Sequence, residues 1–193
     1  MFTEGAPRGF QIAITNVEEG TLGSVPSMGD KPIAQTSNKR LIVESLDREF
    51  ARLHARSCGI VEQITDDALY VSNASGASVG ESILRCAAEI EQTFGGITAN
   101  LWDDPFEWTL PEHLSTKSKI LEHLGEVESL RQRAFTSFSD DACLSKDVAT
   151  PSTETQPLIE LLLKTLLRAS QHQSQARATL KSLSVIEPPG FII

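Results

Sequence analysis

Apolar residues recur every three or four positions in four stretches of the chain, the spacing that places them on one face of an α-helix. These stretches cover residues 38–65, 78–100, 115–139 and 157–183. The fourth stretch is the most apolar, and no segment repeats another. The pattern predicts an all-α domain over residues 38–184, folded as an antiparallel four-helix bundle.

Local residue chemistry marks where these helices begin. Ser78 and Glu81 form a capping box, in which each side chain accepts a hydrogen bond from the backbone N–H of the other residue. Ser115 or Thr116 caps the third helix, and Pro157 suits the first turn of the fourth. The helix starts are therefore predicted independently of the apolar pattern.

Two terminal segments lack helical periodicity. Residues 1–37 are rich in Gly and Pro, which predicts an irregular N-terminal arm. Residues 185–193 contain Pro188-Pro189-Gly190, which cannot continue a helix. We expect these residues to form a C-terminal tail.

The segment LWDDPFEWTLPEHLS, residues 101–115, is unusually aromatic for a connection between helices. It holds both tryptophans, Trp102 and Trp108, together with Phe106. Aromatic rings bury large areas wherever they are excluded from water. We expect this segment to be either a lid across one end of the bundle or the contact of a homodimer.

Charge, hydropathy and cysteine content indicate which partners and which cellular compartment to expect. The net charge of -9 argues against nucleic-acid binding, which needs clustered Lys and Arg. The longest apolar cluster, Leu158 to Leu167, is too short and too interrupted for a membrane span. Three cysteines without a CxxC pair, and a start that does not resemble a secretory signal, lead us to expect a cytoplasmic protein.

Common catalytic motifs are absent from the sequence. It contains no GxxxxGK[ST] loop, GxGxxG turn, GxSxG elbow or HExxH helix. Di-iron bundles need Glu-x-x-His pairs on core faces, and no such pair occurs. The usual nucleotide, acyl-transfer and zincin sites therefore have no sequence support.

A polar trio lies beside the leucine stripe of the fourth helix. Arg168, His172 and Gln175 are spaced so that they project from the same side. Burying an unpaired guanidinium costs several kcal/mol, so these residues need partners.

The helix order and two segments, SVGESILRCAAEIEQTF and LLRASQHQSQARATL, are similar to the DinB-like (YfiT-related) superfamily of four-helix-bundle proteins. The resemblance covers residues 38–184. It implies a divalent-metal site built from a helix-two histidine and a His-x-x-x-His pair on helix four. Members include metal-dependent thiol transferases and hydrolases, and many pair as dimers.

The implied metal site is degenerate in this chain. Its three ligand positions fall on Arg85, Arg168 and His172, so only one histidine is retained. Arginine stays protonated and has no lone pair for a metal. We therefore expect no metal cofactor. The alternative is zinc or nickel held by His172 together with His54 or His113.

Two guanidinium groups beside an imidazole favour a small anionic ligand, such as a carboxylate or phosphate. The candidate ligand-binding residues are Arg85, Arg168, His172 and Gln175. The alternative is a structural network in which the two arginines pair with nearby carboxylates. The carboxylates available for it are Glu44, Glu81 and Glu89.

Cys86 directly follows Arg85 and has two interpretations. A nearby cation would lower the pKa of its thiol and make it a nucleophile. Its place on the apolar stripe instead favours a buried small hydrophobe. The function expected from the sequence is a DinB-like binding or protein-interaction module without catalysis; the alternative is a metal-dependent hydrolase or thiol transferase.

Overall fold

The structure, a computed structural model, describes residues 39–72, 76–108, 113–151 and 155–185 of the 193-residue chain. Contacts divide the chain into two units, Met1–Ser37 and Asn38–Ile193. All described residues belong to the second unit. The expected N-terminal arm and residues 186–193 of the expected tail lie outside the described ranges.

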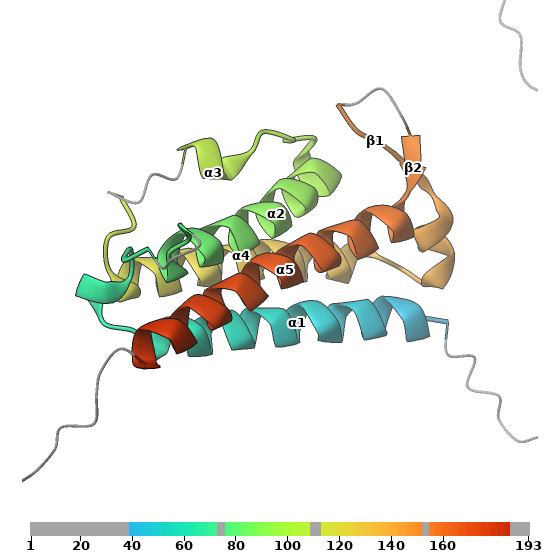
Figure 1. The fold of residues 1–193 in the computed structure, drawn as a ribbon. Coiled ribbons are helices and arrows are strands. Elements are labelled where there is room, and N and C mark those ends of the chain that lie inside the picture. The colour runs from blue at the N-terminus through green and yellow to red at the C-terminus, as the bar shows by residue number, and fades with distance from the viewer. Residues whose placement is uncertain (1–38, 73–75, 109–112, 152–154, 186–193) are drawn as a thin grey trace, which may run out of the picture. The chain divides into compact units, whose positions relative to one another are not determined.

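Within those ranges, four long helices make up most of the domain (Figure 1). They are α1 (Leu41–Glu62), α2 (Val79–Ala99), α4 (Lys117–Ser137) and α5 (Leu158–Val185). All four agree with the helices predicted from the apolar pattern to within a few residues. The mostly helical class predicted from the sequence is confirmed.

Shorter elements fill the connections. They are the 3₁₀ turns η1 (Asp66–Ala68) and η2 (Asp141–Ser145), the one-turn helix α3 (Pro105–Trp108), and the strands β1 (Asp147–Ala149) and β2 (Thr155–Pro157). The strands pair antiparallel, with Val148 opposite Gln156. Residues 140–156 lie between the third and fourth predicted helices and have no element assigned from the sequence, so the hairpin was not predicted.

The helix starts follow the capping chemistry. The Ser78 hydroxyl accepts from the N–H of Glu81, and the Glu81 carboxylate accepts from the N–H of Ser78, which confirms the predicted capping box. Thr116 caps α4. The cap of α1 comes from a distant residue, because Asp141 of η2 accepts from the N–H groups of Ile42 and Val43.

Contacts between side chains fix the helix directions. Thr93 of α2 pairs with Thr165 of α5, and Glu89 pairs with Arg168, so these helices run antiparallel. Arg131 of α4 likewise reaches Asp47 of α1, while Lys117 at the start of α4 reaches the end of α1.

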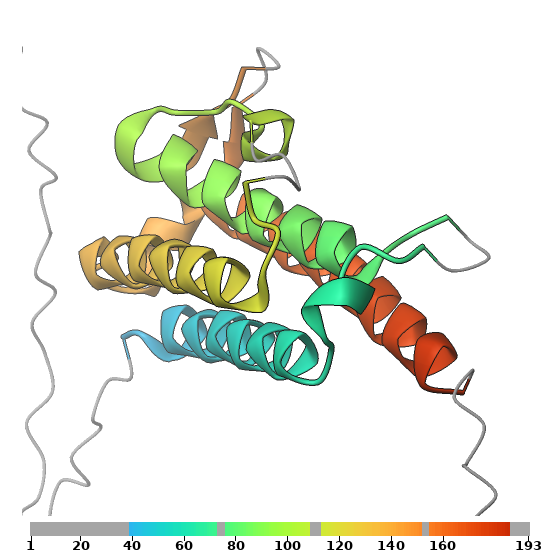
Figure 2. The same ribbon diagram turned by 90° about the vertical axis from the view of Figure 1, so that its left-hand side faces the viewer.

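The other two neighbouring pairs are parallel. His123 of α4 lies near Glu91 of α2, and Leu130 further along α4 lines a cavity with Ala99 at the end of α2. Figure 1 shows α1 and α5 running one way and α2 and α4 the other, and Figure 2 shows α1 beside α4 and α2 beside α5. The long connection from α2 to α4 makes these parallel neighbours possible, because it returns the chain to the end at which α2 began.

The core is built around phenylalanine rings from three helices. Phe50, Phe94 and Phe135 lie with their ring centroids 5.3–5.8 Å apart, and Phe138 packs on Phe135. Leu53 and Leu162 are fully buried beside them. This single cluster continues into the α2–α5 contact, the most extensive between any two helices of the described domain.

The predicted apolar faces are not buried throughout. Ile42 on α1 is 46% exposed, and Leu163 and Leu167 on α5 are 44% and 66% exposed. All three belong to stretches whose apolar residues are expected to face the core. The neighbouring helices cover a narrower face than the apolar pattern suggested.

The aromatic connection packs on its own domain. The ring of Trp102 lies where a Cβ of Gly96 would be, and Phe106 lies under the guanidinium of Arg85. Both rings are half-buried, while the side chain of Trp108 lies outside the described residues. The homodimer expected from these rings stays a prediction, which the mass in solution would test. Among the described helices, none has the length and apolar character needed to cross a membrane.

Candidate functional site

Two of the three sequence-predicted residues on α5 face a carboxylate on α2. Arg168 Nη1 lies 3.8 Å from Glu89 Oε2, and His172 Nε2 lies 4.0 Å from Glu89 Oε1. The Arg168 side chain is 65% exposed. Its guanidinium is therefore solvated and needs no buried partner.

Arg85 lies one turn before Glu89 on α2 and stacks on an aromatic ring. Its guanidinium carbon lies 3.9 Å from the centroid of the Phe106 ring, a cation–π contact. Arg85, Glu89, His172, Phe106 and Asp104 line a cavity of only about 40 Å³. This space holds a few water molecules at most, and two carboxylates already balance its cations.

Gln175 is separated from this cavity. It lines a different hollow of about 310 Å³ with Arg85, Glu81 and Gly76. The structure thus brings Arg85, Arg168 and His172 around Glu89, and it places Gln175 on the far side of Arg85. Of the two arginines, Arg168 pairs with Glu89, one of the carboxylates named for the alternative network, whereas no salt bridge within the described ranges includes Arg85.

The environment of His172 favours its neutral form. Burial lowers the pKa of its imidazole, the Glu89 carboxylate opposes this shift, and the Arg85 guanidinium adds to it. A neutral imidazole is a poor anion binder, because it carries no charge to attract one.

The described residues hold no cluster of three or more His, Cys, Asp and Glu side chains that could bind a metal. His54 does not approach His172. Its Nε2 lies 3.6 Å from the sulfur of Cys58 on the same helix, and its charge acts on Glu128 of α4. His113 is exposed, in the connection before α4.

Cys86 is a core residue. Its side chain is 1% exposed, and its sulfur lies 3.8 Å from the Ser57 hydroxyl. Burial raises the pKa of its thiol to about 11. The interpretation of Cys86 as a small hydrophobe is supported, because the thiolate needed for nucleophilic attack is strongly disfavoured.

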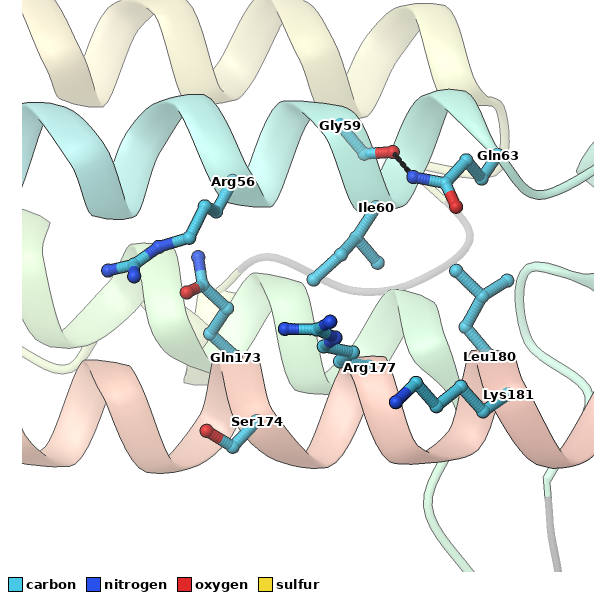
Figure 3. A pocket seen from close by; sticks show the side chains of 9 residues that line it. All are labelled: Arg56, Gly59, Ile60, Gln63, Gln173, Ser174, Arg177, Leu180 and Lys181. Atoms are coloured by element: carbon cyan, nitrogen blue, oxygen red, sulfur yellow. Dashed lines mark hydrogen bonds between the residues drawn. The ribbon is translucent and has the colours of Figure 1, made fainter.

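A different group of cations gathers between α1 and α5, in what we name the α1–α5 groove (Figure 3). This cavity of about 430 Å³ lies between the C-terminal halves of the two helices. Its lining residues are Arg56, Gly59, Ile60, Gln63, Gln173, Ser174, Arg177, Leu180 and Lys181. Three of these side chains are cationic and none is acidic.

The helices that form the groove are held together beneath it. Gln173 is 7% exposed, and its amide nitrogen donates to the Leu53 carbonyl and the Ser57 hydroxyl, both at 2.7 Å. Gln173, Arg177 and Lys181 are spaced four residues apart, so they project from one side of α5. In Figure 3, Arg177 and Lys181 extend from α5 into the space facing Ile60 of α1.

The three groove cations lack ionic partners. No carboxylate in the described residues forms a salt bridge with Arg56, Arg177 or Lys181. Among the Lys and Arg residues that the structure describes, the four with such partners are Arg52, Arg131, Lys164 and Arg168. The groove is thus a positive patch on a chain whose net charge is -9.

Sequence reasoning missed this patch because each of its cations resembles an ordinary solvated residue. A signal was nevertheless present. Helix α5 carries Glu160 as its one acidic residue but holds four basic ones. Only the packing of α5 against α1 shows that two of those basic residues meet Arg56.

The fold and the groove define a mostly helical domain with a cationic cavity between two parallel helices. No family model matches the chain, and a search of curated proteins finds no match either. Membership of the DinB-like superfamily is therefore a proposal.

Proposed function

We propose that this protein is a non-catalytic binding module that holds a small anion in the α1–α5 groove. The observation that carries the proposal is the convergence of Arg56, Arg177 and Lys181 on one cavity that contains no carboxylate. Like charges held close together repel each other, and a bound anion relieves that repulsion. Arginine also binds carboxylates and phosphates through two parallel hydrogen bonds.

Helix electrostatics do not account for these cations. Basic residues stabilise a helix when they lie in its last turn, where the partial negative charge of the helix dipole is concentrated. Neither α1 nor α5 has a basic residue in its last turn. The cations are therefore better explained by a ligand than by the helix ends.

The region around Arg85, Arg168 and His172 is a weaker candidate for the same function. Glu89 lies between these cations, so an added anion would compete with a carboxylate that is already in place. The α1–α5 groove has a volume of about 430 Å³, whereas the cavity beside Glu89 has a volume of only about 40 Å³.

The fold we propose is a DinB-like four-helix bundle with a degenerate metal site, in a cytoplasmic protein. The helix order and the positions of Arg85, Arg168 and His172 around one point support it. The metal-dependent hydrolase or thiol transferase remains the alternative. Stoichiometric zinc or nickel in freshly purified protein would favour that alternative over a binding module.

Calorimetric titration with inorganic phosphate and with acetate tests the anion site. We expect saturable binding that weakens as salt is added, because screening reduces the attraction of the cations. Arg177→Ala should weaken binding by about tenfold or more, the usual effect of losing a hydrogen bond to a charged group.

Arg52→Ala is the matched control. Arg52 lies one turn before Arg56 on α1 and is paired with Glu49, outside the groove. The Arg52→Ala substitution should leave the affinity for phosphate and for acetate unchanged. If neither anion binds, or if both substitutions weaken binding equally, the proposed site is wrong.

A further inference from the structure

Gly59 lies in the last turn of α1, which ends at Glu62, and glycine is unfavourable within a helix. A helix-interior glycine costs about 1 kcal/mol relative to alanine. Packing explains two glycines of α2, because a Cβ at Gly80 would overlap Tyr70 and a Cβ at Gly96 would overlap Trp102. A Cβ at Gly59 would meet no atom within 4 Å. The side chains of the described ranges thus leave the space in front of Gly59 open.

That open space is part of the α1–α5 groove. Gly59 lines the cavity beside Ile60, and Leu180 lines it from α5. Figure 3 shows Leu180 toward the end of the groove that Gln63 borders, whereas Arg56 lies at the opposite end. Leu180 and Ile60 therefore supply apolar side chains on the Gln63 side of Arg56, where Lys181 also lies.

We infer that the ligand is an organic phosphate monoester with an apolar body. Its phosphate lies among Arg56, Arg177 and Lys181, and its body crosses Gly59 between Ile60 and Leu180. This inference rests on the proposed function and adds the class of ligand. A dianionic phosphate neutralises more of the charge of three cations than a monoanionic carboxylate does. Its oxygens can also accept hydrogen bonds from both Arg56 and Arg177.

The size of the cavity is consistent with such a ligand. A volume of about 430 Å³ lies within the range of pockets that hold small organic molecules. An inorganic anion alone would leave most of this volume, including the surface of the half-buried Leu180, in contact with water. An apolar body would remove that surface from water and gain affinity.

The test compares methyl phosphate, hexyl phosphate and hexanoate by calorimetric titration of the full chain. Each methylene buried against Ile60 and Leu180 should tighten binding by up to about fourfold. We therefore expect hexyl phosphate to bind at least about tenfold more tightly than methyl phosphate. Hexanoate should bind more weakly than hexyl phosphate.

Gly59→Leu fills the open space in front of Gly59 and leaves the cations in place. It should abolish the advantage of hexyl phosphate while methyl phosphate binds as before. Gly125→Leu on α4 is the matched control, because a Cβ there also meets nothing within 4 Å and Gly125 lies outside the groove. Both variants should be at least as stable as the original protein, so loss of folding would not explain a change in affinity.

The outcomes separate this inference from the proposed function. Equal affinities for methyl and hexyl phosphate would refute the apolar body and leave an anion site standing. Hexanoate binding as tightly as hexyl phosphate would refute the phosphate head. Absence of binding by all three compounds would overturn both proposals.

Discussion

At the scale of single residues, Arg131 shows how a charge can belong to a protein core. Its side chain is 3% exposed. The guanidinium donates two hydrogen bonds to Glu128, of 2.6 and 2.8 Å, and contacts Asp47 of α1 as well. Although burial opposes it, these bonds hold the pKa of Glu128 below its ordinary value. Both charged forms are therefore favoured in the folded state.

Arg131→Ala is expected to be strongly destabilising, because it leaves the largely buried Glu128 carboxylate without its partner. Removing one member of a buried ion pair costs about 3–5 kcal/mol. Urea unfolding would measure the loss. Arg133→Ala, an exposed neighbour, should change stability by less than about 0.5 kcal/mol. Similar losses for the two variants would contradict this account of Arg131.

The thiols should react slowly. Burial raises the pKa of Cys86 to about 11, and burial followed by the charge of Glu62 raises the pKa of the half-buried Cys58. At pH 8 we expect Cys86 to be labelled at least about a hundredfold more slowly than a model thiol. Labelling of a Cys58→Ser variant, followed by mass spectrometry, isolates the buried cysteines. Fast modification of Cys86 would restore it as a candidate nucleophile.

At the scale of elements, one polar contact lies inside the most extensive helix pair. The hydroxyls of Thr93 on α2 and Thr165 on α5 lie 2.7 Å apart and are buried. Thr165 also donates to the Leu161 carbonyl. A hydroxyl has only one proton, so Thr93 must donate to Thr165. This directional bond fixes how α2 and α5 align.

The direction of that bond predicts unequal effects of two substitutions. Thr165→Val removes the acceptor and leaves the Thr93 proton buried without a partner, a cost of about 1–3 kcal/mol. Thr93→Val leaves Thr165 still bonded to Leu161 and should cost less. The double variant should cost less than the sum of the two. Thermal unfolding of all three variants measures these losses of stability. A larger loss for Thr93→Val than for Thr165→Val would show that Thr93 is not the donor.

The helices could be predicted because their determinants are local. The apolar spacing and the Ser78–Glu81 capping box act within a few residues, so they are visible in the sequence. The hairpin was not predicted, since strands as short as Asp147–Ala149 have too few residues for an alternating pattern. The cap of α1 by Asp141 was also beyond reach, because it joins residues 99 positions apart.

At the scale of the whole molecule, two groups make stability depend on pH in opposite ways. Burial raises the pKa of Glu91, His123 opposes the shift, and Glu126 adds to it. The stabilisation from Glu91 is therefore complete below its ordinary pKa of 4.5 and is lost as the pH rises through its folded value. His172 has a lowered pKa, so its stabilisation is complete above 6.5 and is lost as the pH falls.

Glu91→Gln should accordingly stabilise the domain at neutral pH and have little effect near pH 4. Glu91 Oε2 is buried without a hydrogen-bond partner in the described residues, and His123 Nε2 lies 3.7 Å away. Each kcal/mol gained raises the melting temperature by about 2–4 °C in a domain of this size. Melting curves from pH 4 to pH 8 test this, with the exposed Glu122→Gln as control. If the difference in melting temperature between Glu91→Gln and the original protein does not grow as the pH rises, the role assigned to Glu91 is wrong.

The candidate site could be predicted only in part. Arg168 and His172 face the Glu89 carboxylate, and Arg85 lines a small cavity with Glu89 and His172, so the anion site expected there already contains a carboxylate. The α1–α5 groove depends on which helices are neighbours. Helix directions and neighbours are set by tertiary packing, and an apolar pattern along one helix does not specify them.

The parallel course of α2 and α4 has a consequence for how the chain can change in length. Helix α4 has 21 residues and is about 31 Å long. Residues 100–116 must span roughly that length, and an extended chain covers at most about 3.6 Å per residue. Deletions that leave fewer than about nine residues would force α4 to reverse. Arg131 would then lie far from Asp47. We therefore expect insertions into residues 100–116 to be tolerated more readily than deletions that leave fewer than about nine residues.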